Sequence, residues 1–317
     1  MLRYYALFLL FILQVSCKQN DSKNLFTLVT NSGVEFENRL IENDTMNILD
    51  LEYFYRGGGV AVVDLNNDHL PEIIMGGNMV PSKIYLNKGN FKFKDITEEI
   101  GFLPDRWING ISLIDINRDG FEDIYLSVGG SNTPFLRENI FYVSEGSSEN
   151  GLPLYRDRAT DYGLNSNQAS TQAAFFDYDR DGDYDMILVN TDSDNKNPNT
   201  VKIRLNDGSA NNNDQLFENR MNTEGKFSEV TLQAGILYEG FSLGVAITDI
   251  NEDGWPDIYV ANDHITNDVF YINNGDKTFT NRISELVKNQ SYYSMGVTIQ
   301  DFTNNGHPDI YTLDLMP

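Results

Sequence analysis

Cysteine, histidine and basic residues are scarce in this chain of 317 residues. The one cysteine, Cys17, excludes a disulfide within the chain, so another interaction must rigidify the fold. Lysine and arginine number 23 against 47 acidic residues, which gives a formal net charge of −24. This balance argues against a nucleic acid partner, because phosphates are bound by basic surfaces that displace counterions.

Long apolar runs are also missing. The N-terminal run ALFLLFIL, residues 6–13, is far shorter than the roughly 20 residues needed to cross a bilayer, and it is typical of an export signal. The VSC that ends at Cys17 resembles a bacterial lipobox, with Gln14 where leucine is usual. The resemblance implies a lipoprotein signal peptide over 1–16, a lipidated Cys17, a linker over 17–24 and an outer-membrane, periplasmic or cell-surface location. The alternative is an ordinary signal peptide with an incidental cysteine.

An acidic motif recurs five times. The segments DLNNDHLPEI, DINRDGFEDI, DYDRDGDYDM, DINEDGWPDI and DFTNNGHPDI align, with loops at 64–72, 115–123, 177–185, 249–257 and 301–309. Short apolar runs rich in valine, isoleucine, tyrosine and phenylalanine stand before and after each loop, as in β-strands. Four short strands in a unit of roughly 50 residues are typical of a propeller blade. The sequence predicts an all-β fold, a β-propeller of four-stranded blades over 25–317 with little helix.

The two longer intervals between loops contain polar segments, 144–158, 191–200 and 207–220, which we expect to be inserted loops. The segment 25–36 resembles the outer strand of a unit, and the fifth unit ends after its second strand. This permits a five-bladed ring with a deficient last blade, or the front part of a larger ring of about seven blades. We favour the larger ring, because a closed ring leaves no open sheet edge.

Each loop carries oxygen-bearing side chains at positions one, three, five and nine, and usually glycine at position six. Calcium prefers about six to eight oxygen ligands from carboxylates, amides, backbone carbonyls and water. Two carboxylates about 4 Å apart repel by about 1 kcal/mol in water and about 4 kcal/mol at an effective dielectric near 20. A fivefold recurrence of this repulsion favours bound cations over solvated acidic turns.

An EF-hand begins with the same pattern but needs glutamate at position twelve and flanking helices. Position twelve is Met75, Leu126, Leu188, Val260 and Thr312, and the flanking runs are strand-like. The pattern therefore excludes the EF-hand.

We expect each loop to hold calcium through its side chains and through the backbone carbonyl of position seven. The expected ligands are Asp64, Asn66, Asp68, Leu70 and Glu72; Asp115, Asn117, Asp119, Phe121 and Asp123; Asp177, Asp179, Asp181, Asp183 and Asp185; Asp249, Asn251, Asp253, Trp255 and Asp257; and Asp301, Thr303, Asn305, His307 and Asp309. Three sites should be strong, with the 177–185 loop the tightest by carboxylate count. The other two should be weaker, because His69 replaces glycine in one and two acids are replaced in the 301–309 loop.

These loops and their flanking strands resemble the FG-GAP/VCBS repeats of β-propellers, including integrin α-chains. The stretch VANDHITNDVFYINNGDKTF, residues 260–279, is similar to repeats of the ASPIC/UnbV type. The resemblance implies a propeller in which calcium lies between the first two strands of a blade. It specifies fold and metal but not a biological role.

Signatures of catalysis are absent from the sequence: it contains no G-x-S-x-G elbow, H-E-x-x-H, phosphate loop or nucleotide-binding glycine fingerprint. We expect the histidines His69, His264 and His307 at turn or surface positions. Asp263 and Asp268 are the acids outside the loops that would be tested first if activity were found.

Three aromatic residues, Trp107, Tyr292 and Tyr293, stand just before inner strands and could line a sugar-stacking surface, although such residues more often belong to the core. We therefore expect an exported, calcium-binding propeller that acts as a protein- or glycan-binding adhesion module at the cell envelope, without enzymatic activity. It would touch the membrane only through its lipid anchor. The alternatives are a polysaccharide lyase or hydrolase, and a structural component of an envelope complex.

Overall fold

The computed structural model describes residues 25–315 except residues 45, 50, 52, 131–133, 192–202 and 265. Cys17, the predicted signal peptide and the predicted linker lie outside the described residues, as does most of the polar segment 191–200. The chain forms two compact units, Met1–Ser32 and Gly33–Pro317. Every strand described below belongs to the second unit, and the described part of the first unit, 25–32, has neither strand nor helix.

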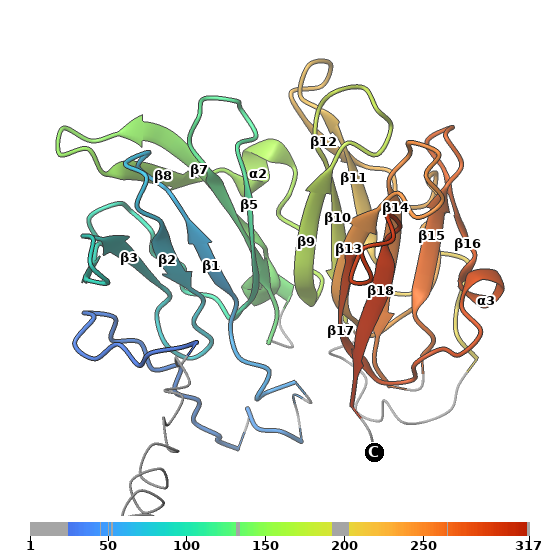
Figure 1. Ribbon diagram of the computed structural model, residues 1–317, viewed down its shortest axis with the longest axis horizontal. Coiled ribbons are helices and arrows are strands. Elements are labelled where there is room, and N and C mark those ends of the chain that lie inside the picture. The colour runs from blue at the N-terminus through green and yellow to red at the C-terminus, as the bar shows by residue number, and fades with distance from the viewer. Residues whose placement is uncertain are drawn as a thin grey trace, which may run out of the picture. The chain divides into compact units, whose positions relative to one another are not determined.

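Four sheets have four antiparallel strands each, paired in chain order, and a fifth sheet has two. The strands are β1 (Val60–Val63), β2 (Glu72–Met75), β3 (Lys83–Asn87) and β4 (Phe93–Asp95); β5 (Ile108–Ile114), β6 (Asp123–Val128), β7 (Ile140–Ser147) and β8 (Pro153–Asp157); β9 (Ser170–Phe176), β10 (Asp185–Asn190), β11 (Gln215–Arg220) and β12 (Lys226–Glu229); β13 (Ser242–Thr248), β14 (Asp257–Asn262), β15 (Val269–Asn273) and β16 (Phe279–Asn281); and β17 (Ser294–Gln300) and β18 (Asp309–Asp314). Figure 1 shows the sheets following one another in chain order. The predicted all-β fold with blade-like four-stranded units is confirmed.

Helix is confined to three short elements in the described residues, η1 (Pro134–Arg137), α2 (Ala159–Tyr162) and α3 (Ile283–Leu286). This agrees with the absence of a 3.6-residue apolar period. None of the described helices is long and apolar enough to span a membrane.

The second strand of a blade is buried on both faces because neighbouring blades cover it. All six residues of β6, β10 and β14 are buried. In β6, Ile124 and Leu126 belong to the apolar cluster between the first two blades, whereas Tyr125 points to the cluster shared with the third. Alternate side chains of a strand leave opposite faces of the sheet, which explains the continuous apolar runs in the sequence.

The first strands of successive blades pack against each other, β1 on β5, β5 on β9, β9 on β13 and β13 on β17. The two end blades are covered on one side only within the described residues. Val60 and Val62 of β1 are 64% and 62% exposed, and Tyr311 and Leu313 of β18 are 59% and 58% exposed.

Two expectations from the sequence are wrong. The segment 25–36 forms no strand. Gly33 instead lies against the backbone of Phe93, where an added Cβ would stand 2.3 Å from the carbonyl oxygen. The carbonyl of Glu35 accepts a hydrogen bond from the Tyr85 hydroxyl at 2.7 Å. Residues 33–36 therefore contact the first blade at single points and pair with no strand.

The polar segments 144–158 and 207–220 are not simply inserted loops. They contain the end of β7, all of β8 and all of β11. The sequence did not show these strands because most of their residues are polar. Only a few apolar side chains hold them to the core: Pro153 and Tyr155 in β8, and Leu216 and Phe217 in β11.

We predict that Gly110→Ala destabilises the fold. A Cβ at Gly110 would stand 2.4 Å from the carbonyl oxygen of Thr171 in the next blade, and a backbone atom cannot move aside without separating the blades. The free energy of unfolding should fall by about 1–3 kcal/mol, as for other overpacked sites, measured by chemical denaturation. Gly296 occupies the equivalent place in β17, where nothing lies within 4 Å of an added Cβ, so Gly296→Ala is the matched control. Equal effects of the two substitutions would contradict this blade packing.

Candidate metal loops and the central cavity

The five acidic loops share one backbone conformation. Position four has a left-handed φ in each, between 54° and 59°, at Asn67, Arg118, Arg180, Glu252 and Asn304. Position six is also left-handed, with φ from 87° to 94° at the four glycines and 69° at His69. Glycine adopts this region without strain, and histidine is among the side chains that tolerate it. These two positions curl the chain so that the acidic side chains turn toward the inside of the loop.

Backbone hydrogen bonds fix the acidic side chains. The Asp115 carboxylate accepts the N–H of Asp119 at 3.0 Å and the N–H of Gly120 at 2.9 Å, and Asp119 accepts the N–H of Phe121 at 2.9 Å. The position-one carboxylate accepts the corresponding pair of bonds in all five loops. The carboxylates are therefore held in place by the loop itself.

The acid at position nine ties three strands together. Glu72, Asp123, Asp185 and Asp257 are at most 1% exposed. Asp123 accepts the N–H of Ile116 in the loop at 3.0 Å and the N–H of Ser144 on β7 at 2.8 Å. The other three make the same pair of bonds, to loop position two and to the third strand.

The fifth loop differs at this position. Asp309 accepts the N–H groups of Phe302 and Thr303 at 3.0 and 3.1 Å, but no third strand follows β18 in the described residues. Its side chain is only half-buried. That the 301–309 loop binds a cation most weakly stays a prediction.

Burial makes the position-nine acids unusually weak. It raises the pKa of Asp123 to about 7 and that of Asp185 to about 8, against the lowering effect of their backbone hydrogen bonds. Nearby loop aspartates push both values further up. Burial also raises the pKa of Glu72 and of Asp257. A bound cation would oppose all of these shifts, because it stabilises the ionised form.

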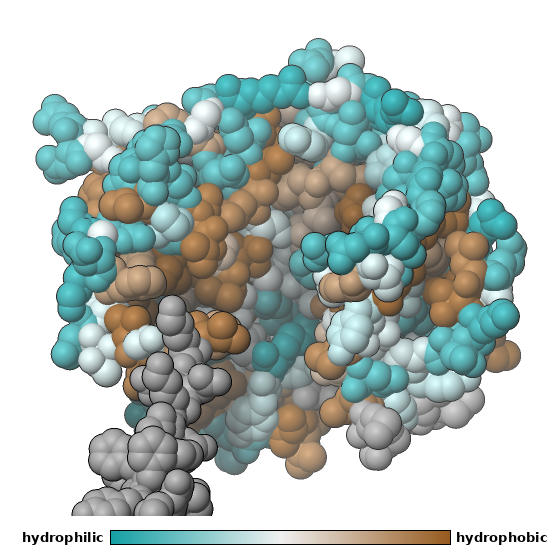
Figure 2. Space-filling model, viewed as in Figure 1, coloured by the Kyte–Doolittle hydropathy of each residue, from teal (hydrophilic) through white to brown (hydrophobic). Residues whose placement is uncertain are grey.

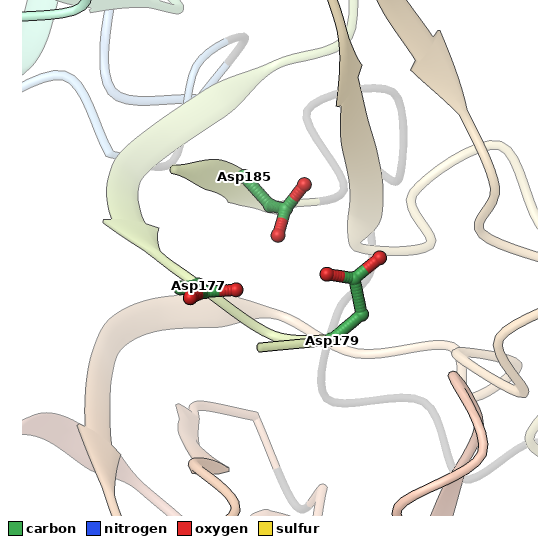
Figure 3. Close-up of side chains that lie close together, drawn as sticks. All are labelled: Asp177, Asp179 and Asp185. Atoms are coloured by element: carbon green, nitrogen blue, oxygen red, sulfur yellow. The ribbon is translucent and has the colours of Figure 1, made fainter. Parts of the chain in front are cut away.

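Three carboxylates converge in the third loop. Asp177, Asp179 and Asp185 each place one oxygen within 4.8 Å of the others, a group that could hold a metal ion, and Figure 3 shows the three groups around a common space. The Oδ1 atom of Asp183 is buried without a hydrogen-bond partner. Such a hard-oxygen donor set suits calcium.

Three other loops have asparagine at position three, which relieves part of the repulsion. The Nδ2 of Asn117 donates to Asp119 at 2.9 Å, and Asn66 and Asn251 make the same bond at 3.1 and 2.8 Å. The third loop has Asp179 instead, and the Lys277 ammonium lies 2.6 Å from its Oδ2. Lys277 stands in the β15–β16 turn of the next blade, so no local pattern in the sequence could have shown this contact.

The predicted ligands of all five loops lie on the loops as expected. Whether each one binds a cation stays a prediction, as does the use of the position-seven carbonyls. The N–H groups of position seven, by contrast, have a clear role, since each donates to the side chain at position five.

A second candidate site is a cavity of about 650 Å³ that the first strands of the blades surround. Its walls come from all five sheets and from the segment before β1: Tyr53, Tyr55, Arg56, Gly59, Val60, Asn109, Gly110, Ile111, Thr171, Gln172, Leu243 and Met295. Figure 2 shows the recess at the centre of the face, with apolar and polar surface around it. The sequence analysis missed this cavity, although the stretch YFYRGGG before β1 was a possible signal.

The two candidate acids outside the loops, Asp263 and Asp268, are held in hydrogen bonds. Asp268 accepts from the Tyr259 hydroxyl at 2.6 Å, the Asn262 N–H at 2.8 Å and the Ser294 hydroxyl at 2.9 Å, which links the fourth blade to β17. Asp263 accepts from the Tyr53 hydroxyl at 3.3 Å. Both side chains are buried.

Of the remaining candidate residues, His264 and Trp107 are buried, whereas Tyr292 and Tyr293 are not. His264 follows β14 in a left-handed turn, as expected, but it is 8% exposed between the rings of Tyr53 and Phe241, so a surface position is wrong for it. Trp107 is buried against Phe54, with ring centroids 5.5 Å apart, and belongs to the core. Tyr292 is exposed and Tyr293 is half-buried.

Fold and loops together define a class: an all-β repeat protein built of propeller-type blades, each with an acidic loop between its first two strands. Residues 64–126 and 249–312 match the family described as FG-GAP-like repeat. Cartilage acidic protein 1 of Xenopus tropicalis is 32% identical over 135 residues, 41% of this chain and 19% of that protein. The match therefore spans about a fifth of the length of that relative.

Two solved structures have a low structural similarity to this chain. One is an Agrocybe aegerita lectin described as recognising non-reducing terminal N-acetylglucosamine, with a TM-score of 0.41, 15% identity and coverage of 79% of this chain and 59% of that one. The other is the biofilm matrix protein Bap1 of V. cholerae, with a TM-score of 0.36, 15% identity and coverage of 77% and 30%.

We predict that the chelated protein becomes less stable as pH rises from 5 to 8. Asp123 and Asp185 titrate near 7 and 8 in the folded state and near 4 when unfolded, so the folded state binds more protons over this range. The stability from these two groups is complete below about pH 4 and is lost as pH rises through their folded pKa values. Melting temperatures measured in chelator should fall accordingly. The double variant Asp123→Asn with Asp185→Asn should show a shallower slope, and a wild-type melting temperature that rises over this range would contradict the account.

Proposed function

We propose that this chain is a calcium-stabilised β-propeller that works as a binding module without enzymatic activity. The observation that carries the proposal is that the acidic loops and the residues lining the central cavity are separate sets of residues. The acidic loops are built into the strand corners and hold the blades, whereas the cavity between the first strands is free of that structural role. A rigid frame with a separate recess suits recognition of a ligand.

The donor set of the loops supports calcium as the cation. Each loop offers carboxylate, amide or hydroxyl oxygens from positions one, three, five and nine, and Asp177, Asp179 and Asp185 already lie close enough to share one ion. Residues of the same loops would hold the ion, and its charge would offset the repulsion between carboxylates. Lys277 supplies part of that offset at Asp179.

Calcium should raise the melting temperature by many degrees, and chelator should lower it. Saturation at one hundred times the dissociation constant stabilises the folded state by about 2.7 kcal/mol for each site. Scanning calorimetry with calcium, with magnesium and with chelator would measure this. Magnesium should be weaker, because it demands a small octahedral shell that these loops of many oxygens do not match. An unchanged melt in chelator would count against structural calcium.

Asp263 and Asp268, the two acids outside the loops that were candidates for catalysis, are buried and hydrogen-bonded, which favours binding over catalysis. A pair of carboxylates could serve as acid and base in sugar hydrolysis. Asp268, however, accepts three hydrogen bonds and connects two blades, and Asp263 is buried beside Tyr53. Neither is a carboxylate open to a substrate.

We further propose that the protein is exported and anchored by a lipid at Cys17, and that its ligand is a protein or a glycan at the cell envelope. The support is the N-terminal sequence and the acidic composition. Metabolic labelling with a fatty acid, compared between wild type and Cys17→Ser, would test the anchor. Label retained in the variant would overturn it.

A glycan array probed with the calcium-loaded protein tests the binding function, with product analysis on every sugar that binds. We expect saturable binding without turnover. Turnover would support a polysaccharide-active enzyme instead. Absence of binding to any glycan or envelope protein would support a structural role.

A further inference from the structure

We propose that the central cavity binds an acidic sugar, whose carboxylate pairs with Arg56. This inference rests on the proposed binding function and names the ligand chemistry of its site.

Arg56 lines the cavity, and two of its three guanidinium nitrogens have no hydrogen-bond partner. Its Nη1 donates to the Thr171 hydroxyl at 3.2 Å, and its guanidinium carbon lies 4.1 Å from the centre of the Tyr53 ring. The Nε and Nη2 atoms are buried and have no hydrogen-bond partner. These two nitrogens form one side of the guanidinium fork, the side that pairs with both oxygens of a carboxylate.

No carboxylate of the described residues forms an ion pair with Arg56. The nearby carboxylate of Asp263 accepts hydrogen bonds from the Tyr53 hydroxyl at 3.3 Å and from the His264 N–H at 2.8 Å. Burial lowers the pKa of Arg56 to about 10, and Tyr53 and Asp263 oppose this only in part. The Arg56 side chain is half-buried and has no carboxylate partner, so an anionic ligand that pairs with it would offset part of the cost of burying its charge.

The rest of the cavity suits a hydroxylated ring better than a small inorganic anion. The side chain of Asn109 donates to the carbonyl of Ser170 at 2.8 Å, which leaves its own oxygen as an acceptor, and Gln172 adds a second amide. Tyr55, 63% exposed, provides an aromatic face. The volume of about 650 Å³ lies within the range of small-molecule sites, roughly 300–1,000 Å³.

Net charge narrows the ligand further. The chain carries a formal charge of −24, which repels polyanions at a distance. One local cation inside an acidic protein therefore selects a single carboxylate, such as a terminal uronic acid, and not a polyanionic chain.

Titration calorimetry of the calcium-loaded full chain with glucuronate and with glucose tests the inference, because the two sugars differ only in the carboxylate. We expect glucuronate to bind roughly tenfold or more tightly than glucose, as for a charged bidentate pair. Arg56→Gln should remove that difference. Arg56→Lys keeps the positive charge but loses the forked guanidinium. This variant should therefore lose most of the difference in affinity between glucuronate and glucose. Arg158→Gln, which removes a surface arginine paired with Asp161 on the second blade, is the matched control and should bind like wild type.

Melting curves of each variant with calcium show whether the fold is retained. Because Arg56 has no carboxylate partner in the free protein, Arg56→Gln should melt close to the wild-type temperature. Equal affinity for glucose and glucuronate, or full glucuronate binding by both Arg56 variants, would overturn the inference. N-acetylaspartate binding as tightly as glucuronate would overturn the assignment to a sugar. A positive glycan array together with no glucuronate binding would defeat this inference alone, whereas absence of binding to any glycan and to any envelope protein would defeat the proposed function itself.

Discussion

The buried acid at position nine is the interaction on which the architecture depends. It accepts one N–H from the loop and one from the third strand, so a single side chain joins the first, second and third strands of a blade. Repeated in four blades, the same bonds take the place that disulfides occupy in many exported proteins. The same acid is buried close to the other carboxylates of its loop. Without a cation, the repulsion between these carboxylates destabilises the loop.

The loops meet this repulsion in two ways. Asparagine at position three removes one charge and donates a hydrogen bond in three loops. The third loop keeps the aspartate and receives an ammonium from the next blade. Lys277 could therefore compete with a cation at the loop that has the most carboxylates. That the 177–185 loop binds calcium most tightly, as its carboxylate count predicts, stays a prediction.

Much of the fold could be predicted because it repeats. Strand periodicity, loop spacing and the glycine at position six of four loops are local properties, and five related loops show them better than one. Contacts between blades could not be predicted in this way. Lys277 at Asp179, Tyr53 at Asp263 and Arg56 at Thr171 join residues far apart in the chain. The strands β8 and β11 were hidden because their apolar residues are few and their flanks are polar.

The number of calcium ions bound at saturation tests the central claim most directly. Native mass spectrometry of the folded chain, titrated with calcium and compared with magnesium, counts them without reference to the ligand. The account predicts at least three ions for each chain, with two more at higher concentration, and loss of one ion in Asp177→Asn combined with Asp179→Asn. A folded chain that binds no calcium, or an ion count unchanged in that variant, would contradict it.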